Sequence, residues 1–199
     1  MKFKTIIFTS LCIFLLTSCE LFYLVSTKEL SMYNNTDSPV VVSCSYFTEG
    51  NSVTIPAYTE VITTVKGYAE NIILFTNGKY YQNAQDSVSL LDYARTSQIL
   101  TPNCSWIKLT NYTGTTISST TLKNTYFYYD EKGNYVGSTI APYQSRYLKL
   151  LNNYNFSYSD YLECYANNTT YISNRSYSIP QNGHTKTIFL YNSDLRPKY

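Results

Sequence analysis

Short β-favouring runs separated by turn residues recur along the chain from residue 28 onward. Asn77-Gly78 stands between the apolar run Ile72–Phe75 and Lys79–Tyr81, which is the strongest short-range signal for a β-hairpin. Glu131–Asn134 separates two tyrosine-rich runs in the same way, and Asn182-Gly183 precedes the last run. Strand signals spaced by roughly 8–12 residues, with Pro and Gly confined to the junctions, are typical of β-sandwiches. We therefore expect an all-β protein.

The composition agrees with this expectation and argues against two classes of protein. Charged residues make up 14% of the 199 residues, whereas aromatic residues make up 17% and tyrosine alone occurs 23 times. Tyrosine favours strands, and disordered chains are poor in aromatic residues. The formal net charge is +2, and Lys and Arg form no cluster longer than a pair. We therefore expect a folded protein that does not bind nucleic acid.

The region from residue 28 onward aligns with itself, which indicates two copies of one small β-unit. In the first two aligned pairs, both blocks lead into a further strand-like run. The aligned blocks are Glu29–Thr36 over Trp106–Thr113, Thr54–Tyr58 over Thr139–Tyr143 and, less closely, Ile99–Asn103 over Ile188–Asn192. We therefore predict two tandem domains, residues 28–103 and 104–199.

The second copy contains a more specific sequence pattern. It reads Asn111–Gly114, then Tyr126–Asp130 and Gly133–Gly137 around a predicted hairpin, then Ile140–Tyr143. This pattern resembles the FxLYD-type and related immunoglobulin-like β-sandwich domains of bacterial cell surfaces, although Tyr143 stands where that family often has glycine. The resemblance covers about forty residues and implies a fold rather than an activity.

The N-terminus has the features of a bacterial export signal. Lys2 and Lys4 precede Ile6–Leu16, an uncharged and mostly apolar stretch that is too short to span a bilayer. The next residues, Leu16–Cys19, resemble the bacterial lipobox. The resemblance implies cleavage between Ser18 and Cys19, with diacylglycerol on the Cys19 thiol and a further acyl chain, such as palmitate, on its amino group. Two or three such chains anchor a protein durably, whereas one holds it only marginally.

Under this interpretation, residues 1–18 are a signal peptide and residues 19–27 are a short apolar tether. The predicted fold class is thus all-β, with two tandem small immunoglobulin-like β-sandwich units after a cleaved signal peptide. The predicted location is a bacterial cell envelope, where the lipid on Cys19 holds the protein to a membrane, facing the periplasm or the cell exterior. Leu21–Val25 is apolar, so we expect the first domain to stay near the membrane and the second to offer the binding surface.

Two alternatives for the N-terminus stay open. One is an ordinary secretory signal with an incidental cysteine. The other is an uncleaved helix over Ile6–Val25, which would place Glu20 inside the membrane. An acidic residue near the centre of such a helix costs about 2.5–3.5 kcal/mol, and less near an end.

Catalytic chemistry has little support in this sequence. His184 is the single histidine and follows a predicted turn, with no framework of nucleophile and orienting group beside it. Cys44, Cys104 and Cys164 are isolated, so they do not form a zinc motif, and no calcium-binding loop is present. These three thiols form at most one disulfide, or else all three are reduced core residues. We predict no catalytic residue, no metal site and no cofactor.

The abundance of tyrosine is the remaining indication of function. Tyrosine stacks on sugar rings and anchors protein interfaces, and it is concentrated at Tyr80-Tyr81, Tyr126–Tyr129 and Tyr154–Tyr161. Alternate strand residues point to opposite faces, so about half of Tyr126–Tyr129 should lie outside the core. We predict a non-catalytic binding, adhesion or envelope-assembly module with an unknown protein or glycan partner. The alternatives are a carbohydrate-binding module with exposed tyrosines, or a small enzyme that uses paired carboxylates or His184.

Overall fold

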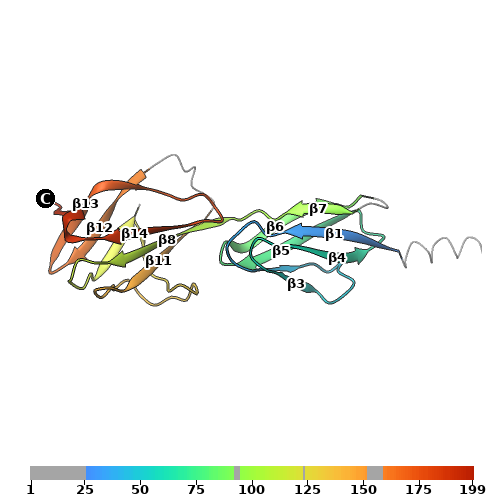
Figure 1. Ribbon diagram of the computed structural model, residues 1–199, viewed down its shortest axis with the longest axis horizontal. Coiled ribbons are helices and arrows are strands. Elements are labelled where there is room, and N and C mark those ends of the chain that lie inside the picture. The colour runs from blue at the N-terminus through green and yellow to red at the C-terminus, as the bar shows by residue number, and fades with distance from the viewer. Residues whose placement is uncertain (1–25, 92–94, 123, 152–158) are drawn as a thin grey trace, which may run out of the picture. The chain divides into compact units, whose positions relative to one another are not determined.

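The computed structural model describes residues 26–91, 95–122, 124–151 and 159–199, and these residues are almost entirely β-strands and turns (Figure 1). The helical structure in these ranges is one short 3-10 helix, η1 (Asn192–Asp194). The strands are β1 (Thr27–Tyr33), β2 (Val40–Ser43), β3 (Ser52–Ile55), β4 (Glu60–Lys66), β5 (Asn71–Gly78), β6 (Tyr81–Ser89), β7 (Thr96–Ile99), β8 (Cys104–Asn111), β9 (Ser119–Leu122), β10 (Thr125–Tyr126), β11 (Ser145–Leu151), β12 (Ser159–Ala166), β13 (Thr169–Ser178), β14 (Thr185–Leu190) and β15 (Leu195–Pro197).

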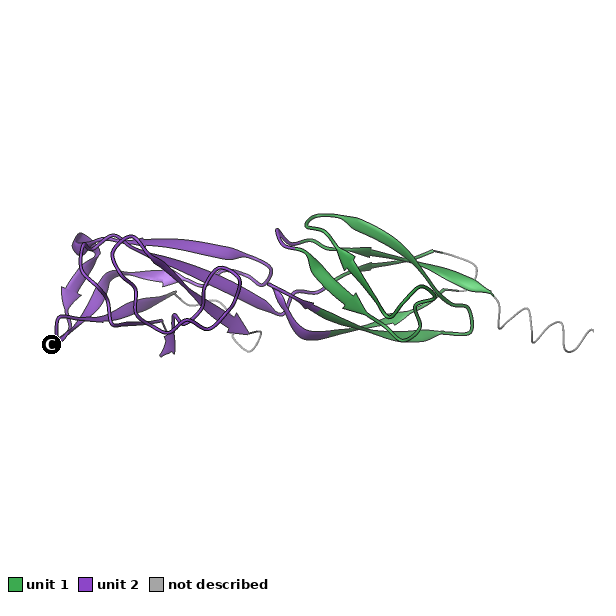
Figure 2. Ribbon diagram, turned by 90° about the horizontal axis from the view of Figure 1, so that it is seen from below, with its two compact units in different colours: residues 1–35, 39–76, 85–100 green, residues 36–38, 77–84, 101–199 purple. Residues whose placement is uncertain are grey.

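The strands form two compact units, and each unit is a sandwich of two sheets (Figure 2). Unit 1 has the sheets β4-β1-β7 and β3-β2-β5-β6, whereas unit 2 has β11-β8-β14 and β10-β9-β12-β13-β15. Among the described residues, unit 1 comprises the chain up to residue 35, 39–76 and 85–100. Unit 2 comprises 36–38, 77–84 and 101–199, so three short segments of the predicted first domain group with the second.

The two units share one topology, in which each strand of unit 1 corresponds to the strand seven places later. The first strand of unit 1, β1, pairs with β4 antiparallel and with β7 parallel. In unit 2, β8 pairs with β11 antiparallel and with β14 parallel. The order β3-β2-β5-β6 recurs as β10-β9-β12-β13, to which unit 2 adds β15. The predicted all-β class with two tandem sandwich units is thereby confirmed, while the signal peptide lies outside the described residues.

A buried asparagine at the end of each first strand marks equivalent positions in the two copies. Asn34 and Asn111, which the sequence alignment superimposes, are both fully buried. The side-chain amide of Asn34 donates to the carbonyl oxygen of Ile55 at 3.3 Å, and that of Asn111 donates to Ile140 at 2.9 Å. Ile55 and Ile140 are themselves aligned, so the first two aligned blocks correspond in hydrogen bonding as well as in sequence.

The third aligned block requires a correction of one residue. The sequence alignment placed Ile99 over Ile188, whereas the strand pairing makes Ile99 equivalent to Phe189. Ile99 lies opposite Tyr33 in β1, and Phe189 lies opposite the aligned residue of β8. The physical reason is alternation along the strand, because Ile99 and Phe189 are exposed while the following residues, Leu100 and Leu190, are fully buried.

The core of each unit follows from this alternation. In β5, Ile72 and Leu74 are buried between the sheets, whereas Ile73 and Phe75 face outward. The core of unit 2 draws on strands of both sheets and consists of Ile107, Leu109, Ile117, Leu122, Phe127, Ile140, Leu148, Leu150, Leu162, Cys164, Tyr177, Ile179, Ile188 and Leu190. Full burial of one Leu or Ile side chain stabilises the folded state by about 1.5–3 kcal/mol. The packed core of unit 2 thus holds its two sheets and the strand ends in place.

The hairpin predicted at Asn77-Gly78 is present, but its turn lies two residues later. β5 and β6 are neighbours in one sheet and are joined by Lys79-Tyr80. The side-chain oxygen of Asn77 accepts a hydrogen bond from the backbone N–H of Asn83 at 3.1 Å. Asn77 therefore acts across the hairpin from within the strand instead of forming the turn itself.

The second predicted hairpin is confirmed around Glu131–Asn134. Tyr129 and Tyr135 form an antiparallel bridge on either side of the turn. The Asp130 carboxylate accepts backbone hydrogen bonds from Lys132 and Asn134 and a side-chain bond from Asn134. These hydrogen bonds, of which the side-chain bond from Asn134 is the strongest influence, lower the pKa of Asp130. The role of the Asp130 carboxylate is therefore to stabilise this turn.

Candidate functional site

Asn111 organises the end of unit 2 at which β8 finishes. Its amide donates to the backbone carbonyls of Thr115 at 2.8 Å and Ile140 at 2.9 Å. Its side-chain oxygen accepts from the backbone N–H and the hydroxyl of Thr113, at 2.9 and 2.8 Å. Every hydrogen-bonding atom of this amide thus has a partner, as a buried amide requires. The turn that follows β8 is held in one conformation as a result.

Four exposed aromatic residues lie at this end of unit 2, and we call them the aromatic cluster: Tyr112, Tyr143, Phe189 and Tyr191. Their exposed fractions are 40%, 75%, 49% and 47%. The ring of Tyr112 is central, with its centroid 5.3 Å from Tyr191, 5.7 Å from Tyr143 and 5.9 Å from Phe189. The cluster is therefore one continuous surface rather than scattered exposed rings.

Strand alternation and a strained turn bring these rings together. Along β14, Ile188 and Leu190 enter the core, so Phe189 and the following Tyr191 face outward. Tyr143 adopts a left-handed backbone conformation with φ of 64°, which is uncommon for an aromatic residue. Its N–H donates to the backbone oxygen of Asn111 at 2.7 Å, which fixes the turn beside Tyr112.

The rings of the aromatic cluster do not lie in one plane. Tyr112 and Tyr191 stack on each other with an interplanar angle of 19°, whereas Tyr143 meets Tyr112 edge-on at 80°. Rings that cover each other's faces do not form the flat row of coplanar rings that would stack on successive sugars. Grouped tyrosine side chains are instead typical of the residues that anchor protein interfaces.

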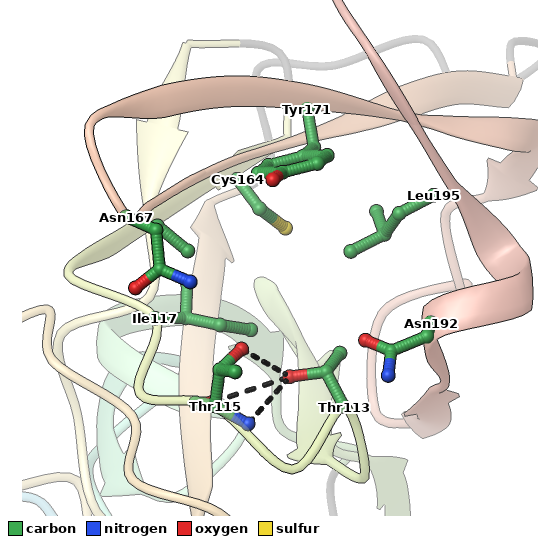
Figure 3. A pocket seen from close by; sticks show the side chains of 9 residues that line it. Thr113, Thr115, Ile117, Cys164, Asn167, Tyr171, Asn192 and Leu195 are labelled. Atoms are coloured by element: carbon green, nitrogen blue, oxygen red, sulfur yellow. Dashed lines mark hydrogen bonds between the residues drawn. The ribbon is translucent and has the colours of Figure 1, made fainter.

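A pocket of about 220 Å³ lies at this end of unit 2 (Figure 3). Thr113 and Asn192, which directly follow Tyr112 and Tyr191 in sequence, line it, whereas none of the four rings of the aromatic cluster does. Its other lining residues are Thr115, Ile117, Cys164, Ala166, Asn167, Tyr171 and Leu195. Sites for small molecules usually measure about 300–1,000 Å³, so this smaller pocket suits a single inserted side chain.

The pocket lacks an activated nucleophile among its lining groups. Figure 3 shows the Cys164 sulfur directed into the open space, and the Cys164 side chain is 1% exposed. Burial raises the pKa of this thiol to about 12, so the nucleophilic thiolate is not formed at neutral pH. The hydroxyl of Thr113 bonds to Asn111 and lies 3.2 Å from the Thr115 hydroxyl. These lining groups are suited to non-covalent binding.

The residues that the sequence singled out for chemistry are not brought together. Cys44, Cys104 and Cys164 are three separate, free and buried thiols. Burial raises the pKa of Cys104 to about 11. His184 is exposed beside the turn that precedes β14. Within the described ranges, no three His, Cys, Asp or Glu side chains are grouped so that they would hold a metal ion.

The lipidation site lies outside the described residues. Ser18 and Cys19 belong to this part of the chain, as does the Ile6–Val25 stretch of the alternative helix. None of the helices in the described part is long and apolar enough to cross a membrane. Cleavage before Cys19 and its lipidation therefore stay predictions.

The tyrosine concentrations noted in the sequence divide between core and surface. Tyr80 and Tyr81 are buried, whereas Tyr126 and Tyr135 are 41% and 70% exposed. The Tyr128 ring lies between the latter two, with centroids 5.1 and 5.2 Å away. This forms a second exposed aromatic group on unit 2. Residues 154–158 of the third concentration are outside the described ranges.

Sequence reasoning did not single out the aromatic cluster. Its members come from three segments that the sheet pairing of unit 2 brings together, and no local concentration of tyrosine marks them. Two signals were present in the sequence. Phe189 and Tyr191 alternate with the apolar core residues of β14, and Tyr143 aligns with Tyr58, which also has a positive φ of 51°.

Comparison with known proteins places few further constraints on this chain. No family model matches the sequence. No curated protein matches it either, so the FxLYD-type resemblance stays a prediction. Among solved structures, the TIE protein of Bacillus anthracis is 10% identical with a TM-score of 0.27, covering 83% of this chain and 34% of its own length. The shaft pilin SpaA from Lactobacillus rhamnosus GG is 7% identical with a TM-score of 0.32, covering 83% and 98%. At these TM-scores, neither likeness indicates what this chain binds.

Proposed function

We propose that this chain is a lipid-anchored, non-catalytic binding module of a bacterial cell envelope that engages a protein partner through the aromatic cluster. The observation that carries this proposal is the packing of four exposed aromatic rings into one surface. Solvent-exposed aromatic surface of this kind marks interaction sites, because its burial by a partner is favourable. Envelope location and anchoring rest on the lipobox ending at Cys19.

The composition of the aromatic cluster supports a protein partner over a glycan. Interface hot spots are enriched in tyrosine and lie together near the centre of an interface, and the aromatic cluster groups three tyrosines and one phenylalanine. A partner would lay an apolar surface on Tyr112 and Tyr143. The carbohydrate alternative requires an array of open ring faces, which the stacking of Tyr112 on Tyr191 does not supply.

The test compares two double variants of the full-length protein expressed in its own host. Tyr143→Ser with Tyr191→Ser removes two rings of the aromatic cluster. Tyr126→Ser with Tyr135→Ser removes two similarly exposed rings of the second aromatic group and serves as the matched control. Cross-linking of whole envelopes should give an adduct in the control that is weakened or lost in the first variant. Truncation of an interface hot spot costs at least about 2 kcal/mol, or roughly 30-fold in affinity.

The opposite pattern would refute the proposed site. An adduct that both variants keep, or that both lose equally, means that the aromatic cluster is not the binding surface. A glycan array on the purified protein tests the carbohydrate alternative. Glycan binding that Tyr143→Ser weakens would show that the ligand of the aromatic cluster is a sugar and not a protein. Mass spectrometry of the mature N-terminus tests the anchor independently, because an intact Met1 or an unmodified Cys19 contradicts it.

A further inference from the structure

One end of unit 1 is defined by the point where the described chain begins. β1 starts at Thr27, and the carbonyl oxygen of Ser26 accepts a hydrogen bond from the N–H of Gly67 at 2.7 Å. Gly67 has no space for a side chain, because a Cβ there would collide with Ser26. Ser26 is therefore held against the turn after β4.

Three loops of unit 1 meet at this end. Lys66 lies opposite Thr27 in the β1–β4 pairing, and its N–H donates to the carbonyl of Tyr46 at 2.9 Å. The N–H of Leu90 donates to the carbonyl of Glu70 at 2.7 Å. These backbone contacts join the loop after β2, the loop after β4 and the loop after β6.

The tips of these loops carry exposed apolar groups. Tyr68 is 44% exposed and Leu91 is 58% exposed. The Tyr68 ring contacts Tyr46 edge-on, with centroids 6.1 Å apart. Two lysines stabilise the same loops. The ammonium of Lys28 donates a hydrogen bond to the carbonyl of Ala69 at 3.0 Å, and that of Lys66 donates to the carbonyl of Ser45 at 3.2 Å. Apolar tips backed by lysines match the composition of surfaces that rest at a membrane–water interface.

The length of the preceding chain limits how far this end can move from a lipid on Cys19. Seven peptide steps separate Cys19 from Ser26. Fully extended, seven residues span at most about 25 Å, of which about 5–8 Å crosses one headgroup layer. Five of the intervening residues, Leu21–Val25, are apolar or aromatic and favour the interface over water. The tether therefore keeps this end of unit 1 within about 20 Å of the headgroup layer, and its apolar residues favour a closer approach.

We propose that Tyr46, Tyr68 and Leu91, with Lys28 and Lys66 behind them, form a surface that rests on the headgroup layer of the membrane. This inference rests on the proposed lipid anchor at Cys19. The contact fixes which end of unit 1 faces the bilayer, because the opposite end of β1 lies six residues away along the strand, or roughly 20 Å. Glu70 at the same end offsets part of the lysine charge, so the contact does not depend on anionic lipids.

The test uses the lipidated full chain in vesicles of zwitterionic phosphatidylcholine that contain nitroxide-labelled lipid. A single cysteine is introduced by Tyr68→Cys or Leu91→Cys and labelled with a fluorophore. Labelling is selective because the three native thiols described by the structure are buried. The matched controls are Tyr58→Cys and Ile99→Cys, which replace residues 61% and 63% exposed at the opposite end of unit 1. All four positions are on the surface, so each variant should fold, which urea unfolding verifies.

We expect the nitroxide lipid to quench most of the emission from positions 68 and 91 and little of that from positions 58 and 99. Equal quenching at both ends, with Cys19 shown to be lipidated by mass spectrometry, overturns the membrane-contact surface and leaves the proposed function intact. A free Cys19 thiol, detected as fluorophore on the parent protein and by its unmodified mass, overturns the anchor and this inference together.

Discussion

Replacing Asn111 by alanine should destabilise unit 2 by about 3 kcal/mol. The Asn111 side chain is fully buried and makes four hydrogen bonds, to the backbone of Thr115 and Ile140 and to the backbone and hydroxyl of Thr113. A buried hydrogen bond contributes about 1 kcal/mol net, and an orphaned partner costs up to about 3 kcal/mol. The Thr113 hydroxyl lies 3.2 Å from the Thr115 hydroxyl, so it finds another partner and one of the four losses is recovered.

The assay follows the fluorescence of Trp106 during urea unfolding. Trp106 is the only tryptophan of the chain and lies in unit 2 with 4% of its surface exposed, so its emission reports the unfolding of that unit. With a urea dependence of about 1–3 kcal/mol/M, the midpoint should fall by about 1–3 M. Asn174→Ala is the control, since Asn174 is exposed and donates one hydrogen bond, to Ser193. A loss in Asn111→Ala no larger than in this control would refute the reasoning.

Three further predictions concern stability and thiol chemistry. Asn34→Ala should destabilise unit 1 by about 2 kcal/mol while leaving the Trp106 transition unchanged, as measured by circular dichroism beside fluorescence. Cys104 and Cys164 should resist alkylation at pH 8 until urea unfolds the chain. Burial raises the pKa values of these thiols in the folded state from 9.0 to about 11 and about 12. Their contribution to the free energy of unfolding is therefore complete below pH 9 and falls as the pH rises toward 12. Gly183→Ala should cost unit 2 about 1–2 kcal/mol by thermal unfolding, because Gly183 has φ of 81° and a Cβ would lie 3.0 Å from Pro102.

The two copies share a framework but differ in what they expose on it. Both have a buried asparagine after the first strand and a tyrosine of positive φ at the equivalent turn, Tyr58 and Tyr143. In unit 2, Tyr112 and Tyr191 surround the second of these tyrosines. The position of Tyr112 is taken by Asn35 in unit 1, so Tyr58 lacks the central ring around which a cluster forms. The two copies therefore share the turn, and the additional aromatic residues of unit 2 assemble the exposed cluster around it.

Local signals in the sequence were sufficient for much of the fold. The β-favouring runs, the turn at Glu131–Asn134 and the two-copy alignment depend on neighbouring residues or on direct comparison of segments, and each corresponds to an observed feature. The turn of the first hairpin lies at Lys79-Tyr80 instead of Asn77-Gly78, because Asn77 uses its side chain to bond Asn83 across the strands. The alignment of Ile99 was one residue off, since identities were too few to fix which face of the strand each residue occupies.

The sequence by itself determined the strand periodicity and the repeated order of the two copies, because these are encoded in residues close together or in repeated order. Only the tertiary structure decided which exposed rings meet and which loops lie beside the entering chain. Tyr112, Tyr143 and Tyr191 come together through the antiparallel β8–β11 and parallel β8–β14 pairings, and parallel strands are joined by long connections whose return point is set by packing of the whole core. A cluster assembled across such distances leaves no local pattern in the sequence, which is why its position depends on the folded sheets.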